Sequence, residues 1–177
     1  MDGLYFCDRV PEPASAIRIA RLYDVPKILP AAYYDLYCIE DIDRDWDDYQ
    51  GRPLASYRIA DLKSGRRIAR WSQMDLVDMK RLLRLQKYLT GKQIGLDPEL
   101  YDVVVCGGTV CQSRYALLRL DLFGALGWYQ GNDVLERVKT YGAPKPGMCT
   151  SCHTNFTTFT DMAREEIWSD LPRRVGL

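Results

Sequence analysis

Hydrophobic positions along the chain recur mostly at the spacing of an α-helix. Residues 16–23 form one short helical stretch after Pro13, with Ser15 as the expected N-cap. A second helix is predicted after Asp24, and Pro30 is expected to kink it near its start. Its apolar positions fall at i, i+3, i+4, i+7 and i+11: Val25, Ile28, Leu29, Ala32 and Leu36. The two stretches together predict a helical hairpin.

A longer apolar pattern follows in the middle of the chain. The run Ser72-Gln73-Met74-Asp75 resembles a capping box and predicts a helix start, and Gly91 is the expected stop. The apolar positions in between are Leu76, Met79, Leu82, Leu83, Leu85 and Leu89. Because they span a wide face, we expect a central core helix that is buried on more than one side.

The C-terminal half predicts one short strand and further helices. The β-branched run at 101–106 indicates the strand, which ends before Gly107 and Gly108. The expected helices are residues 114–127 with Ser113 as N-cap, a short helix through Tyr141 with Asn132 as its cap, and residues 161–170 after Thr160, with Met162, Ile167 and Trp168 facing inward. The pattern as a whole predicts a mainly α, irregular multi-helix domain. We divide it into a segment 1–13, a helical lobe 14–95 and a lobe 96–177 that carries a cysteine cluster.

Composition and charge narrow the possible functions. The chain has 177 residues, 47% hydrophobic and 27% charged, and a formal net charge of zero. A neutral chain lacks the basic footprint typical of nucleic-acid or membrane-surface binding. It has no run of roughly 18 apolar residues and no signal-peptide pattern at its N-terminus. We therefore expect a cytoplasmic or nuclear protein, in which thiols stay reduced.

Four of the six cysteines form two short clamps in the C-terminal half. They are Cys106-x4-Cys111 and Cys149-x2-Cys152, separated by 37 residues. Two cysteines joined by a short loop can both reach one ion, and four thiolates suit tetrahedral zinc. Gly107 and Gly108 allow the wider clamp to bend around a metal. The pattern predicts a structural zinc site with these four cysteines as ligands, a knuckle-like cluster that closes a helical insertion.

Other interpretations of these residues stay open. The cysteines could be small buried hydrophobic residues without a metal, as we expect for Cys7 and Cys38. The run from Cys149 to His153 also matches the pattern for covalent attachment of haem, with Met162 as the one nearby axial candidate. A redox dithiol at Cys149 and Cys152 lacks the expected βαβ setting. His153 directly follows Cys152, so we expect it beside the site or at the surface. No catalytic constellation accompanies the cysteines, which predicts a protein that is not an enzyme.

Two stretches resemble a known family. The run Ala-Ile-Arg-Ile-Ala-Arg-Leu-Tyr-Asp-Val-Pro-Lys-Ile-Leu-Pro-Ala-Ala-Tyr-Tyr-Asp-Leu at 16–36 is similar to the helices that follow the BTB/POZ fold in fungal BTB/POZ domain-containing proteins. The tail Arg-Glu-Glu-Ile-Trp-Ser-Asp-Leu-Pro-Arg-Arg-Val-Gly-Leu at 164–177 is similar to the terminal helix of that family, which also follows a Cys-x-x-Cys pair. The resemblance covers roughly residues 14–38, 66–92 and 106–177, and the BTB domain itself is lacking.

The resemblance implies a non-catalytic protein-interaction module, similar to the C-terminal part of a BTB-type adaptor or transcription-associated protein. Because the BTB domain is lacking, its dimerisation and its recruitment of a ubiquitin ligase scaffold are not expected here. An unknown protein is the expected partner, and neither nucleic acid nor a membrane is expected. The alternatives are a zinc-dependent nucleic-acid-binding regulator and a small haem or thiol redox protein. Neither the partner nor the oligomeric state follows from the sequence.

Overall fold

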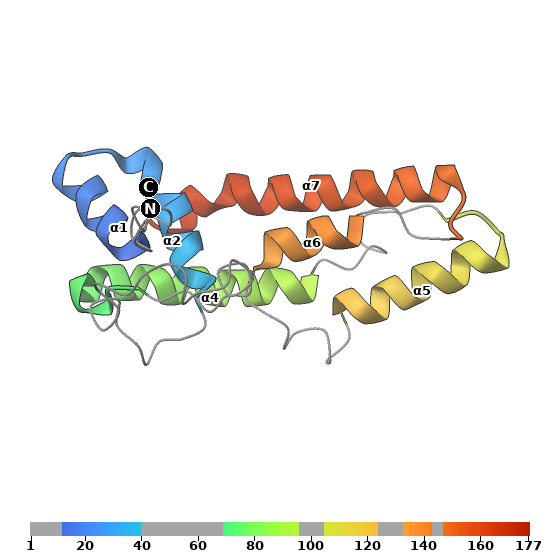
Figure 1. The fold of residues 1–177 in the computed structure, drawn as a ribbon, viewed down its shortest axis with the longest axis horizontal. Helices are drawn as coiled ribbons and strands as arrows, with labels where there is room; N and C mark the ends of the chain where they lie inside the picture. The colour runs from blue at the N-terminus through green and yellow to red at the C-terminus, as the bar shows by residue number, and fades with distance from the viewer. Residues whose placement is uncertain (1–11, 40–68, 96–104, 124–132, 143–146) are drawn as a thin grey trace, which may run out of the picture. The chain divides into compact units, whose positions relative to one another are not determined.

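The computed structural model describes residues 12–39, 69–95, 105–123, 133–142 and 147–177. Within these ranges the chain is mainly helical and contains no β-strand, which confirms the predicted fold class (Figure 1). The elements are α1 (Pro13–Leu22), η2 (Pro26–Ile28), α2 (Leu29–Tyr37), η5 (Trp71–Gln73), α4 (Leu76–Gly95), α5 (Thr109–Phe123), α6 (Val134–Gly142) and α7 (Thr150–Arg174), where η marks a 3-10 helix.

The chain divides into two compact units. Unit 1 comprises Met1–Lys87 and Leu171–Leu177, and unit 2 comprises Tyr88–Asp170. Helices α4 and α7 each contribute to both units. Unit 1 thus contains α1, α2 and the first part of α4, whereas α5, α6 and most of α7 lie in unit 2.

Helix α1 begins earlier than predicted because of its N-cap. The carboxylate of Glu12 accepts hydrogen bonds from the backbone N–H groups of Ala14 (2.9 Å) and Ser15 (2.6 Å). Pro13 occupies the first turn, where its missing N–H costs nothing. Ser15 therefore lies within the helix, and its predicted role as the N-cap is wrong. The propensity of serine for caps is outweighed by a carboxylate that binds two free N–H groups.

The connection between α1 and α2 turns sharply at Asp24, whose φ is 53°. The N–H of Val25 then bonds the carbonyl of Ala20 at 2.7 Å, which closes the end of α1. Pro30 lies in the first turn of α2, where proline is well tolerated. The single helix predicted after Asp24 is divided into η2 and α2 just before this proline. The predicted apolar face is buried at Leu29, Ala32 and Leu36 but exposed at Val25 and Ile28.

A buried carboxylate joins the helices of unit 1. The Asp78 side chain accepts a hydrogen bond from the Tyr33 hydroxyl at 2.6 Å and one from the Arg21 guanidinium at 2.7 Å. Asp78 is only 2% exposed, so it needs such partners to offset its lost hydration. Burial, followed by the bond to Asp78, raises the pKa of Tyr33 far above its ordinary value. The network therefore ties α1 and α2 to the first turn of α4.

Helix α4 differs from its prediction at both ends. Asp75 caps it, since its Oδ1 accepts the N–H of Asp78 at 2.8 Å, whereas Ser72 lies within η5. The helix continues past the predicted stop at Gly91 and ends at Gly95. Leu85 and Leu89 are fully buried, but Leu76 and Leu83 are exposed. The helix was predicted to be buried on more than one side, but the buried leucines lie on a narrower face.

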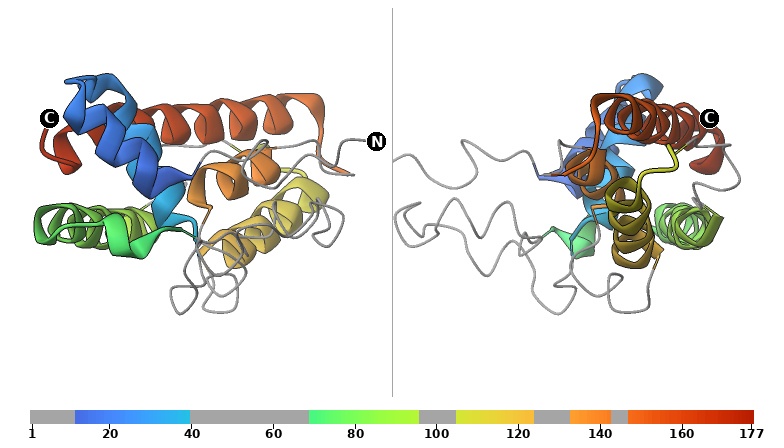
Figure 2. Two further views of the ribbon diagram at one scale, coloured as in Figure 1. Left: turned by 60° about the vertical axis from the view of Figure 1, so that its left-hand side comes forward. Right: turned by 90° about the vertical axis from the view of Figure 1, so that its right-hand side faces the viewer.

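Unit 2 contains the end of α4 together with α5, α6 and most of α7, and α6 lies alongside α5 and α7 (Figure 2). Tyr115 of α5 contacts Phe156 of α7 edge to face, with ring centroids 6.4 Å apart. Val134 and Val138 of α6 are buried, as is Ile167 of α7. The inward position predicted for Ile167 is confirmed. Met162 and Trp168 are instead 56% and 49% exposed, so their predicted inward positions are wrong.

The starts of α5 and α7 are the largest departures from prediction. Helix α5 begins at Thr109 and α7 at Thr150, whereas starts near residues 114 and 160 were expected. Helix α6 forms close to its predicted position, but Asp133 precedes its first residue and accepts the N–H of Glu136 at 2.9 Å, the capping role that was predicted for Asn132. Asn132 lies outside the described residues. Residues 101–104 of the predicted strand and the expected end of α5 near residue 127 also lie outside them. The early starts of α5 and α7 bring Cys111 and Cys152 into the first turns of these helices.

Candidate metal centre

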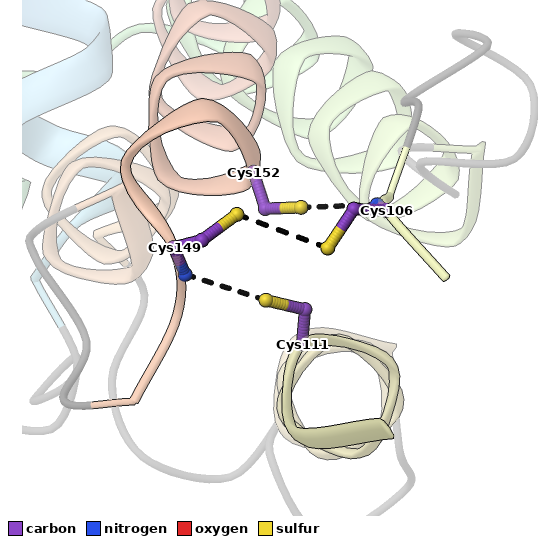
Figure 3. Close-up of side chains that lie close together, drawn as sticks. All are labelled: Cys106, Cys111, Cys149 and Cys152. Atoms are coloured by element: carbon purple, nitrogen blue, oxygen red, sulfur yellow. Dashed lines mark hydrogen bonds between the residues drawn. The ribbon is translucent and has the colours of Figure 1, made fainter. Parts of the chain in front are cut away.

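The structure brings the four predicted ligands together in unit 2. The Sγ atoms of Cys106, Cys111, Cys149 and Cys152 all lie within 4.8 Å of one another (Figure 3). Cys106 and Cys149 precede α5 and α7, whereas Cys111 and Cys152 lie in the first turns of these helices. Each clamp therefore joins a non-helical residue to a helix start.

The helix starts set the position of each clamp. The carbonyl of Gly108 accepts the N–H of Gln112, and the carbonyl of Cys149 accepts the N–H of His153, both at 3.0 Å. Gly108 and Cys149 are thus the N-cap residues of α5 and α7. A cysteine at an N-cap and another three residues later lie on the same side of the first turn. This geometry explains how the Cys-x2-Cys spacing presents two sulfurs to one point.

Gly147 directs the chain into the second clamp. Its φ is +90°, a conformation that residues with a Cβ rarely adopt. A Cβ at this position would also lie 3.3 Å from Cγ1 of Val110, next to Cys111. Glycine is therefore strongly favoured at this position, where the chain enters the second clamp.

Backbone N–H groups hold the two clamps against each other. The N–H of Cys106 donates to Sγ of Cys152 at 3.0 Å, and the N–H of Cys149 donates to Sγ of Cys111 at 3.3 Å. Each buried sulfur thus accepts a hydrogen bond from the first cysteine of the opposite clamp (Figure 3). Such bonds to sulfur stabilise thiolates, which are the form that binds metal. The sequence pattern contains no signal for these backbone donors.

The spacing of the sulfurs matches a tetrahedral metal site. Zinc–sulfur bonds of about 2.3 Å place the sulfurs of a tetrahedron about 3.8 Å apart. The Sγ atoms of Cys106 and Cys149 are 3.8 Å apart. Cys111 and Cys152 are 5% and 2% exposed, whereas the other two cysteines are exposed. The residues present therefore fit one metal ion held at the edge of unit 2.

The thiols influence one another strongly without an ion. The N–H of Cys152 and the neighbouring thiols lower the pKa of Cys149 to about 7. The N–H of Cys106 favours the thiolate of Cys152, but burial and the surrounding thiols raise the pKa of Cys152 to about 12. The N–H of Cys149 likewise lowers the pKa of Cys111, and burial with neighbouring thiols raises it overall. Four close thiolates repel one another, which makes it unfavourable for all four cysteines to be charged. A bound divalent cation would offset this repulsion and favour the thiolate forms.

The other candidate residues lie outside the four-sulfur group. The ring of His153 is half-buried and its Nε2 is 3.4 Å from the Thr157 hydroxyl, one turn further along α7. The metal-binding group found among the described residues consists of cysteines alone. Cys38 follows α2 in unit 1, and Cys7 lies outside the described ranges.

Comparison with known proteins gives no further assignment. No protein-family model matches the chain, and searches of curated proteins and of solved structures also find no significant match. In the part of the chain that the structure describes, no helix is long and apolar enough to cross a membrane.

Proposed function

We propose that Cys106, Cys111, Cys149 and Cys152 hold a structural zinc ion. The observation that carries this proposal is the convergence of four sulfurs within 4.8 Å, with one pair at the spacing of a zinc tetrahedron. Four sulfurs within 4.8 Å of one another leave room for a single ion. An iron–sulfur cluster places several irons and sulfides between its cysteine ligands. A closed set of four thiolates leaves no open position for substrate, so the role of the ion is structural.

We further propose that the zinc-stabilised chain is a non-catalytic protein-interaction module. The resemblance to the region after a BTB domain supports this class of function. Unit 1 adds a second support, because large apolar side chains are exposed where α1 ends and η2 begins, an arrangement that often marks a binding surface. These side chains are Ile19, Leu22, Tyr23, Val25 and Ile28, with Leu22 and Tyr23 at 71% and 70% exposure.

Metal analysis of the purified chain tests the zinc site. We expect about one zinc per chain, and a strong chelator should lower the melting temperature, because metal-binding free energy becomes folding free energy. Cys149→Ser should lose most of the zinc. Cys38→Ser is the matched control, since Cys38 lies in the other unit, and it should keep a full equivalent. A metal-free chain that cannot be loaded and melts cooperatively with or without chelator would contradict the proposal.

The interaction role is tested by comparing surface variants in cells. Proximity labelling with the wild-type chain should identify neighbouring proteins, and Leu22→Glu should remove the bound partner from that set. Met162→Glu places the same charge on an exposed apolar position of unit 2 and serves as the control. Equal labelling by all three chains would contradict a binding role for the unit 1 surface.

A further inference from the structure

The two exposed cysteines of the cluster form a distinct pair. We propose that Cys106 and Cys149 are an oxidation site, where peroxide forms a disulfide across the two clamps and releases the metal. This inference rests on the proposed zinc site and adds a regulatory chemistry to it. The reactive pair is defined by exposure and by sulfur geometry.

Exposure separates the four sulfurs into two classes. Cys106 and Cys149 are exposed, whereas Cys111 and Cys152 are 5% and 2% exposed. Peroxide must reach a sulfur directly, so oxidation of a thiolate follows its access to solvent. Attack at the exposed sulfurs is therefore favoured.

The geometry favours a bond between the clamps. The Sγ atoms of Cys106 and Cys149 are already 3.8 Å apart, and a disulfide requires about 2.0 Å. Both residues lie outside the helical segments, so they can approach without unwinding a turn of α5 or α7. Cys111 and Cys152 are within helices, where the backbone holds their positions. The exposed pair can therefore form the bond while both helices keep their first turns.

The oxidation proceeds in two balanced steps. One exposed thiolate attacks peroxide, the O–O bond breaks, and a sulfenic acid and hydroxide form. The second thiolate attacks the sulfenic sulfur, forms the S–S bond and displaces a second hydroxide. The two sulfurs lose two electrons in total, peroxide gains them, and two solvent protons convert the hydroxides to water. The metal then has only the two thiolates of Cys111 and Cys152, which lowers its affinity and leads to release.

The test uses the zinc-loaded chain of 177 residues treated with hydrogen peroxide. Zinc release is followed with a coloured chelator, and the disulfide is mapped by mass spectrometry of alkylated, digested protein. We expect about one zinc released per disulfide, a predominant Cys106–Cys149 linkage, and rebinding of zinc after reduction. Cys38→Ser, which leaves the cluster intact, should release zinc at the wild-type rate.

Two results would overturn the inference. One is a predominant linkage within a clamp or between Cys111 and Cys152, and the other is retention of zinc without any disulfide. Neither result affects the proposed zinc site, because both are measured on chains that already hold the metal. Conversely, failure to load zinc would refute the zinc site before any peroxide is added. The mapping uses the wild-type chain, so no variant has to fold for the result to count.

Discussion

At the scale of single residues, Asp78 is a buried carboxylate that joins three helices of unit 1. Its Oδ1 accepts a hydrogen bond from the Tyr33 hydroxyl, and its Oδ2 accepts one from the Arg21 guanidinium. A buried carboxylate that loses a partner keeps its desolvation penalty without compensation. The contribution of each partner is therefore open to measurement by substitution.

Tyr33→Phe should destabilise the chain by about 1–2 kcal/mol, because Asp78 would lose its buried hydroxyl donor. Tyr23→Phe is the control, since Tyr23 is 70% exposed, and it should change stability by less than about 0.5 kcal/mol. Urea denaturation followed by circular dichroism measures both. Equal stability of the two variants would refute the role of the hydroxyl.

Asp75 gives the chain a pH dependence of defined sign. The N–H of Asp78 and the side chain of Arg21 lower the pKa of Asp75 below its ordinary value. A depressed folded-state pKa contributes stability above the unfolded-state pKa, and this stability is lost as pH falls through the folded-state pKa. Asp75→Asn retains a side-chain cap but removes the charge. The stability difference between wild type and this variant should be present at neutral pH and shrink in acid, as measured by urea denaturation across pH.

At the scale of elements, the starts of α5 and α7 determine the cluster. Each start places one cysteine outside the helix and one inside its first turn. Gly147 lies between the two helix starts. It packs against Val110 in the first turn of α5, and its backbone conformation positions Cys149 before α7. The cluster thus depends on the backbone around it as much as on its sulfurs.

Gly147→Ala should therefore weaken both folding and metal binding. A side chain at φ +90° is strained by about 1–3 kcal/mol, and its Cβ would crowd Val110. Gly107→Ala in the other clamp is the matched control, because a Cβ there meets nothing within 4 Å. Competition with a zinc indicator and thermal melting should show a loss in the first variant alone. Similar losses in both variants would contradict this account.

At the scale of the whole molecule, the two units carry different stabilising interactions. All four cluster cysteines lie in unit 2, whereas the network around Asp78 lies in unit 1. Removing zinc should therefore affect the units unequally. Hydrogen exchange measured with and without chelator should show loss of amide protection in α5 and α6, while α1 and α2 retain theirs. Uniform loss through both units would show that the metal controls the folding of the entire chain.

The sequence by itself determined the helical class of the fold and the four cysteines that could share a metal. Both depend on local information, since apolar spacing defines a helix, and two cysteines separated by two or four residues define a clamp. Helix ends were predicted less well. Glu12 and Asp75 took the capping roles expected for Ser15 and Ser72, because the identity of a cap depends on which free N–H groups a side chain reaches in the folded chain.

Only the tertiary structure decided which faces are buried and how the clamps meet. Trp168 and Leu83 occupy apolar positions of their helices yet remain exposed, because burial requires a partner surface that spacing alone does not provide. The reciprocal N–H bonds from Cys106 and Cys149 join residues 46 and 38 positions apart along the chain. No local pattern encodes such contacts. The sequence thus identified the four sulfurs, and the fold decided that two of them are buried and that the two exposed ones lie 3.8 Å apart.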